Sequence, residues 1–253
     1  MDIFSLAEGP TLLTFDNIDS TNAEAKRMIE GGFGAEGDIV FANSQTAGHG
    51  RLGREWYSPN GNFYLSFILE PKYQLAQAAQ LSFVTSLALL KAIRKFVPTA
   101  LQKDLSCKWP NDVFLKDKKL AGILLESKFS HNHQLWLIVG VGVNLAESPN
   151  NTLVKATCLQ DHDVTLTAND LLYDFLVEFN KYYSSWLTEG FTTIRNSWLD
   201  NAYGLNKKDT IKPTSEILEG IFTDVDMEGN LLLKIDNKIE KINSGEIFFQ
   251  DSL

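Results

Sequence analysis

The stretch Gly48–Trp56 reads GHGRLGREW and places three glycines, two arginines, a histidine and a tryptophan in one short run. Glycine lets the backbone adopt unusual conformations and approach a ligand closely. Arginine presents a planar fork of donors that fits carboxylate and phosphate groups. The ring of Trp56 offers a flat face on which a base can stack. The run therefore predicts a loop that wraps a small anion; the alternative is a charged, glycine-rich surface loop.

The overall charge makes this basic loop more informative. The chain of 253 residues carries a formal net charge of −9, and such a surface repels a phosphate backbone, which argues against a general nucleic-acid binder. The positive charge gathers in two places, the loop and a second segment that contains Lys103, Lys108, Lys116, Lys118 and Lys119. Two basic islands in an acidic chain indicate a small anionic ligand that is held from two sides.

The composition indicates a globular protein, because 44% of the residues are hydrophobic and 22% are charged. No apolar run approaches the roughly 20 residues needed to span a bilayer, and the N-terminus lacks the pattern of a secretory signal. The only cysteines are Cys107 and Cys158, which suits a reducing compartment. We therefore expect a cytoplasmic protein that has no membrane or nucleic-acid partner.

Hydrophobic periodicity predicts helices interleaved with strands in the first four-fifths of the chain. We expect a first helix that starts at a capping box, Thr21–Glu24, and stops at Gly31-Gly32. Further helices are expected at 74–97, 167–187 and 194–203, and strands at 38–43, 62–69, 120–127 and 135–143. This pattern indicates an α+β fold in which a mixed sheet carries helices on one face.

The pattern changes near Gly204–Lys207, after which short strands follow one another with turns at 228–230 and 236–238. A run of short strands predicts a small β barrel or sandwich. We therefore expect two domains, residues 1–204 and residues 205–253.

Two polar motifs follow the loop. Lys108-Trp109-Pro110-Asn111-Asp112 supplies a cation, an amide and an anion, and its proline marks a strand end or turn. The alternative is a polar turn with Trp109 packed beneath it. Lys119-Leu120-Ala121-Gly122 places a lysine just before a strand, and its alternative is a charged hairpin turn.

Two further motifs flank these. Gly140-Val141-Gly142-Val143-Asn144 has two glycines within a strand, which is typical of close approach by a ligand or another backbone. Asn144 stands at the strand end, where its amide can read the edge of a base. Asp19-Ser20-Thr21-Asn22 is at least a helix cap. His131 and His133 lack a supporting set of metal ligands nearby in sequence, which favours a solvated turn.

Together, DSTN, QTAGHGRLGREW, KWPND, KKLAGILLE and GVGVN, in this order and spacing, resemble the biotin protein ligases. The resemblance runs from about residue 15 to 146 and implies a class II synthetase-like catalytic sheet followed by a small SH3-like β-barrel. Some members carry an N-terminal DNA-binding domain. The short segment before DSTN leads us to expect the ligase-only class.

The resemblance implies an ATP-dependent, AMP-forming ligase that uses Mg²⁺. Biotin would be converted to biotinyl-5'-AMP and then transferred to a lysine of a biotin carboxyl carrier protein. One alternative is a lipoate-type ligase of the same fold, although the KWPND element argues against it. Another is a non-catalytic biotin sensor or carrier-binding module, although the retained lysine and arginines argue against that. Edge strands of the sheet leave a homodimer open.

Carried over residue by residue, the resemblance implies three groups of site residues. The biotin-binding group is Ser20, Thr21, Asn22, Gln45, Gly48, Arg51 and Gly122. The nucleotide-binding group is Arg54, Trp56, Lys108, Asn111 and Asn144, with Asp112 as a ligand of Mg²⁺. The catalytic group is Arg51, Lys119 and Arg54.

The chain departs from the family at His49, where arginine is usual. Arginine is permanently charged, whereas histidine, with an ordinary pKa of about 6.5, is mostly neutral at pH 7. We therefore expect the loop to hold the reaction intermediate less tightly than an arginine-bearing loop does.

Overall fold

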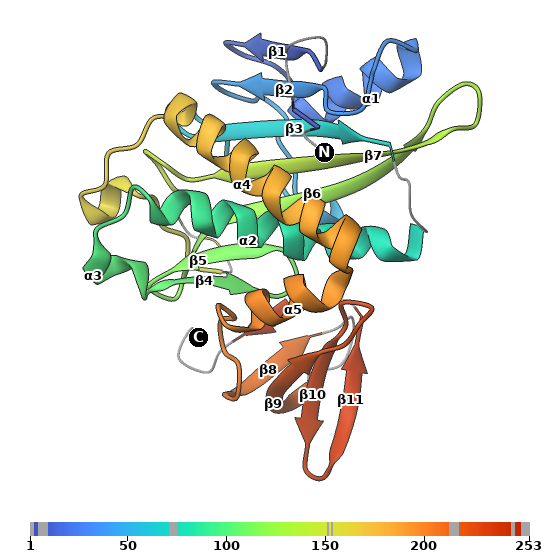
Figure 1. The fold of residues 1–253 in the computed structure, drawn as a ribbon. Helices are drawn as coiled ribbons and strands as arrows, with labels where there is room; N and C mark the ends of the chain where they lie inside the picture. Colours follow the sequence, from blue (N-terminus) through green and yellow to red (C-terminus); the bar gives the residue numbers. More distant parts are fainter. Residues whose placement is uncertain are drawn as a thin grey trace.

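A mixed seven-stranded sheet forms the centre of the larger part of the protein (Figure 1). The computed structural model describes residues 3–4, 10–70, 75–150, 152, 154–212, 218–243 and 246–248. The strands lie in the order β1-β2-β3-β7-β6-β5-β4, with β1 and β2 parallel and all other neighbours antiparallel. Their bounds are β1 Leu12–Phe15, β2 Ile39–Ala42, β3 Phe63–Leu69, β4 Leu105–Lys108, β5 Asp112–Leu115, β6 Lys118–Phe129 and β7 Leu135–Val143.

One face of this sheet carries the main hydrophobic core. Alternation along β3 turns Phe63, Leu65 and Phe67 to this face. Three helices cover it: α2 Leu81–Arg94, α4 Ala168–Glu189 and α5 Phe191–Leu199 (Figure 1). The rings of Phe67 and Phe179 meet edge to face, with their centroids 4.6 Å apart. These contacts fix α4 against the centre of the sheet.

The opposite face carries α1, Thr21–Gly31, so the helices do not all lie on one face. Met28 and Ile29 of α1 pack in a second, smaller cluster with Val40, Ile68 and Ile138. These strand positions alternate with those that face the main core, which places α1 on the other side of the sheet. The remainder of that face carries the candidate site described below.

Periodicity located most of the long elements to within a few residues. The first helix, however, is capped by Ser20, whose side chain accepts from the Ala23 N–H, rather than by Thr21. The predicted helix at 74–97 begins as a 3₁₀ turn, η2 Leu75–Gln80, before α2. The short elements β1, β4, β5 and α3, Thr99–Gln102, were not predicted, nor were two 3₁₀ turns, η1 Arg51–Gly53 and η3 Gln160–His162.

The C-terminal strands form a second, antiparallel sheet in the order β11-β10-β9-β8-β12. Their bounds are β8 Lys208–Lys212, β9 Leu218–Val225, β10 Leu231–Ile235, β11 Lys238–Ile242 and β12 Glu246–Phe248. The expected change to short strands and both expected turns are present. No pairing joins β11 to β12 among the described residues, so this part of the chain is an open sheet there rather than the closed barrel that we expected.

The two sheets share one hydrophobic core. Phe222, Leu231 and Leu233 belong to the same buried cluster as Phe83 of α2 and Trp198 of α5. The indole of Trp109 donates to the carbonyl of Gly229 at 3.0 Å, and Gln80 donates to the carbonyl of Met227 at 2.9 Å. The C-terminal sheet therefore docks on the KWPND segment and on the start of α2. In the described ranges no helix has the length and apolar character needed to cross a membrane.

Because the core is continuous, Phe222→Ala is expected to destabilise both parts of the molecule together. Removal of this fully buried ring should lower the free energy of unfolding by about 3–5 kcal/mol. Circular dichroism and calorimetry should show one transition shifted to lower temperature. The matched control is Ile221→Ala on the same strand, which is 39% exposed and should change stability by less than about 1 kcal/mol. A separate small transition that moves alone would contradict the shared core.

Candidate active site

A floor of glycines lies on the sheet face that carries α1. Gly142 of β7 pairs with Gly122 of β6, which in turn pairs with Asp112 of β5, so the three lie in one row across the strands. The indole of Trp56 lies on this floor. A Cβ on Gly142 would stand 2.5 Å from the indole nitrogen, and one on Gly122 would stand 3.1 Å from the ring. Only glycine allows the indole to approach this closely.

The indole N–H of Trp56 is buried and has no hydrogen-bond partner. Buried donors are rarely left unpaired, because each loses its hydrogen bonds to water. In Trp56 this buried donor lies against Gly142 of β7.

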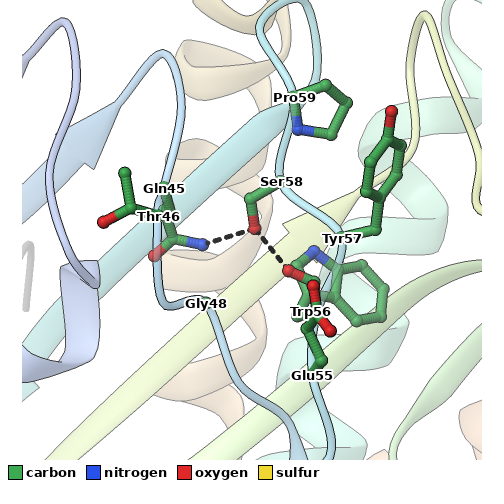
Figure 2. Close-up of a pocket in the computed structure, with 8 residues that line it drawn as sticks. All are labelled: Gln45, Thr46, Gly48, Glu55, Trp56, Tyr57, Ser58 and Pro59. Atoms are coloured by element: carbon green, nitrogen blue, oxygen red, sulfur yellow. Dashed lines mark hydrogen bonds between the residues drawn. The ribbon is translucent and has the colours of Figure 1, made fainter.

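Polar side chains from α1 and the loop meet beside the floor. Gln45 accepts from the backbone N–H of Thr21 at 2.8 Å and donates through its amide nitrogen to Ser58 Oγ at 3.1 Å. Ser58 in turn donates to the carbonyl of Trp56 at 2.7 Å, and the bond from Gln45 to Ser58 ties the two arms of the loop together (Figure 2). A pocket of about 310 Å³ opens here and is lined by Gln45, Thr46, Gly48, Glu55, Trp56, Tyr57, Ser58 and Pro59 (Figure 2).

Ser66 of β3 anchors the first turn of α1 to the sheet. Its fully buried hydroxyl lies 2.7 Å from Thr21 Oγ1 and 2.5 Å from Asn22 Oδ1. A hydroxyl has one hydrogen, so Ser66 donates to the amide oxygen of Asn22 and accepts from Thr21. The amide nitrogen of Asn22 donates to Glu126 at 2.8 Å. Both ends of the Asn22 amide are therefore held by protein groups, and Asn22 shapes the site wall.

The charged side chains of Lys119 and Asp112 lie at the other side of the glycine floor. Lys119 Nζ lies 2.8 Å from Asp112 Oδ1 and 5.3 Å from the centroid of the Trp56 ring. The register shifts where β5 meets β6, so that Phe114 pairs with Lys119 and Val113 with Ala121. This extra residue in β6 changes the alternation of side chains and turns Lys119 toward the face of Gly122.

The basic loop reaches the KWPND segment through Arg51. Its Nη1 donates to Asn111 Oδ1 at 3.2 Å, and the amide nitrogen of Asn111 donates to the carbonyl of Ile123 at 2.5 Å. Burial lowers the pKa of Arg51; the nearby charge of Asp112 opposes this shift, and that of Arg54 adds to it. Arg51 is thus a partly desolvated cation of the loop that contacts the second basic segment.

The other predicted nucleotide residues lie around this end in different ways. Arg54 is exposed in the loop. Lys108 is buried, with its ammonium 4.6 Å from the centroid of the Phe114 ring. The amide nitrogen of Asn144 donates to the carbonyl of Thr157 at 3.1 Å, which ties the end of β7 to the segment beside Lys119. Ser20 is occupied as the helix cap.

Sequence reasoning missed Ser66, Ser58 and Glu126. Ser66 lies between core positions of a strand whose alternating residues are aromatic or aliphatic, so its polar side chain had to face the other side of the sheet. That position could have been identified from the period of two. Glu126 lies in the motif KKLAGILLE, but nothing in the sequence distinguished it from a solvated strand residue.

Comparison with known proteins agrees with this architecture. Residues 14–144 match the biotin/lipoate A/B protein ligase family, and residues 210–250 match the biotin protein ligase C-terminal domain. The chain belongs to the biotin protein ligase family. It is 37% identical to the biotin–acetyl-CoA-carboxylase ligase of Paracoccus denitrificans, over 91% of this chain and 97% of that one. The bifunctional ligase/repressor BirA of Bacillus subtilis is 30% identical, over 94% of this chain and 74% of that protein.

A solved member of the family has the same fold. The biotin protein ligase from Aquifex aeolicus, in complex with biotin and ATP, superposes with a TM-score of 0.79 at 27% identity. The match covers 94% of this chain and 97% of that one. The expected family and its α+β fold are therefore confirmed, whereas α1 on the second face and the open C-terminal sheet differ from the expectation.

Ser66→Ala should weaken the wall of this site. It removes the shared hydroxyl and leaves a buried hydroxyl on Thr21 and a buried amide oxygen on Asn22 without that partner. The expected loss is about 2 kcal/mol in the free energy of unfolding, measured by urea denaturation. Ser127→Ala on β6, an exposed hydroxyl, is the control and should change little. Equal stability of both variants would show that the Ser66 hydrogen bonds are unimportant.

Proposed function

We propose that this chain activates biotin with ATP to form biotinyl-5'-AMP and then transfers biotin to a lysine of a biotin carboxyl carrier protein. The observation that carries the proposal is the convergence of Arg51, Lys119 and Asp112 at one end of a glycine floor whose other end is lined by hydroxyl and amide groups. Such a site suits a ligand with a neutral polar head and an anionic tail.

In the first step a carboxylate oxygen of biotin attacks the α-phosphorus of ATP. The bond to the bridging oxygen breaks, and pyrophosphate leaves with the electron pair. Negative charge accumulates on the phosphate oxygens in the transition state, so fixed cations in a partly dry site supply the main stabilisation. We assign this role to Lys119 and Arg51, with Arg54 closing from the loop.

The biotin end of the site is proposed to lie where α1 meets Gln45. Ser20, Thr21, Asn22 and Gln45 surround a polar niche. We place Gly48 and Gly122 at its edge, where a Cβ would meet Ser58 and Trp56. Gln45 and Thr21 are already held by each other and by neighbouring groups, so they need little reordering when a ligand arrives. A preorganised set of this kind fits a neutral ureido ring.

The nucleotide end is proposed to use Trp56, Lys108, Asn111 and Asn144. Trp56 supplies a ring face, and its buried N–H lies against Gly142 without a hydrogen-bond partner. Asp112 has an oxygen that accepts no well-aligned hydrogen bond, although Lys119 lies close to it. A single carboxylate together with substrate phosphates is a common way to hold Mg²⁺, so Asp112 fits the metal that would neutralise the phosphates. No cluster of three acidic, histidine or cysteine ligands is present within the described residues.

In the second step the amine of the carrier lysine attacks the activated carbonyl of biotin, and AMP leaves. We propose that residues 205–253 form a second domain, which helps to bind the carrier protein or the nucleotide. The support is that its β9–β10 turn contacts Trp109 beside the nucleotide end. The two free, buried cysteines are consistent with the cytoplasmic location that we predict.

The activity is tested by mixing the chain with ATP, Mg²⁺ and either biotin or lipoate. We expect pyrophosphate release and, with a carrier domain, AMP release in the biotin arm alone. Removal of Mg²⁺ with a chelator should stop the reaction. Turnover of lipoate would favour the lipoate-type alternative, and biotin binding without pyrophosphate would indicate a sensor.

Lys119→Ala should reduce pyrophosphate release by about a hundredfold. Loss of one charge-assisted contact in a partly desolvated site corresponds to roughly 3 kcal/mol in the barrier. The control is Lys118→Ala, the preceding residue, which is exposed. Circular dichroism should show that both variants fold. A Lys119→Ala rate within threefold of the unsubstituted chain would remove Lys119 from the catalytic group.

A further inference from the structure

Glu126 of β6 joins the helix side of the site to the loop. Its Oε1 accepts from Lys26 Nζ at 2.7 Å, and its Oε2 accepts from the Asn22 amide at 2.8 Å. The same Oε2 lies 3.6 Å from Nε2 of His49, near the start of the Gly48–Trp56 loop. One carboxylate therefore contacts both the wall of the biotin pocket and the loop that closes it.

The two nitrogens of His49 face different groups. Nδ1 lies 3.4 Å from the carbonyl of Ala47. A carbonyl only accepts hydrogen bonds, so a bond there requires the hydrogen on Nδ1. A neutral imidazole has a single N–H, and Nε2 then presents a lone pair to the carboxylate of Glu126. A second proton turns Nε2 into a donor, and only the imidazolium makes both bonds.

The group that faces Nε2 of His49 is an ionised carboxylate. Partial burial opposes ionisation of Glu126, but the hydrogen bonds from Lys26 and Asn22 outweigh it, so the pKa of Glu126 lies below its usual value. The carboxylate is therefore ionised throughout the range, from about pH 5 to 8, in which histidines change charge. Lys26 on α1 is engaged with Oε1, and Glu55 pairs through its backbone with His49 in the loop. Arg51 and Arg54 follow further along the loop.

We propose that Glu126 is a positioning residue that holds the Gly48–Trp56 loop closed through His49 when the imidazole is protonated. The inference rests on the proposed function, because the closed loop would retain biotinyl-5'-AMP. It also assigns a role to His49, which stands where arginine is usual in the family. An arginine at this position would hold the loop at every pH, whereas His49 makes retention of the adenylate stronger in mild acid and weaker in mild base.

The first test is the rate of biotinyl-5'-AMP release, measured by stopped flow without a carrier at about pH 6 and about pH 8. Release should be about fivefold slower at the lower pH, the size expected for a partly exposed charged contact. His49→Gln and Glu126→Gln should each remove this pH dependence, and His49→Arg should slow release at both pH values. His131→Gln, an exposed histidine in the β6–β7 turn, should keep the original pH dependence. An unchanged pH dependence in His49→Gln overturns the proposal.

The second test needs no biotin chemistry. Hydrogen–deuterium exchange of peptides covering 46–57 is compared between the unsubstituted chain and His49→Gln at each pH, so that intrinsic exchange rates cancel. The loop of the unsubstituted chain should be more protected than that of the variant at about pH 6 and equal to it at about pH 8. Equal exchange of the two proteins at both pH values overturns the proposal that Glu126 holds the loop closed through His49. If the loop shows this protection but the chain forms no adenylate, the proposed function is overturned and the role of the Glu126–His49 contact is kept.

Discussion

The site depends on the absence of Cβ atoms at Gly122, Gly140 and Gly142. At Gly142 a Cβ would meet the indole of Trp56, and at Gly140 it would overlap the amide of Asn22. Glycine normally weakens a strand interior, because it has no side chain to pack and loses more freedom on folding. Here two glycines stand in β7, which is hydrogen-bonded along its length to both β3 and β6. The ladder on both sides keeps the strand in place, so the close approach is tolerated.

Close approach brings polar groups of α1 down to the sheet, and each then needs a partner. Ser66 satisfies Thr21 and Asn22, Gln45 satisfies the N–H of Thr21, and Glu126 satisfies the other end of Asn22. An unmade bond anywhere in such a network exposes a buried polar group to the full cost of desolvation. The first turn of α1 is therefore both a helix start and a rigid wall of the site.

The sequence analysis identified the elements that have a hydrophobic period and the residues that belong to a motif. The alternation from Phe63 to Leu69 gave β3, and the five motifs gave the family and the residues that meet at the glycine floor. Strands of four residues such as β1, β4 and β5 are too short to show a period. The cap was misplaced because Ser20 and Thr21 both have hydroxyls; tertiary contact decides, since Ser66 engages Thr21. Likewise only the register shift between β5 and β6 shows why Lys119 reaches the site face.

The nucleotide end and the C-terminal sheet are coupled through the turn between β9 and β10. Burial opposes ionisation of Asp226 in this turn, but hydrogen bonds from Lys241 and Asn230 outweigh it and lower the pKa of Asp226 to about 2. That stabilisation is present above the ordinary pKa of the carboxyl, 3.8, and is lost as the pH falls toward 2. The same turn presents the carbonyl of Gly229 to the buried indole of Trp109, within the segment that carries Asp112. Displacement of the turn would leave a buried N–H unpaired beside the site. The hydrogen bonds and the shared core thus join the two sheets across the domain boundary that we propose near residue 204.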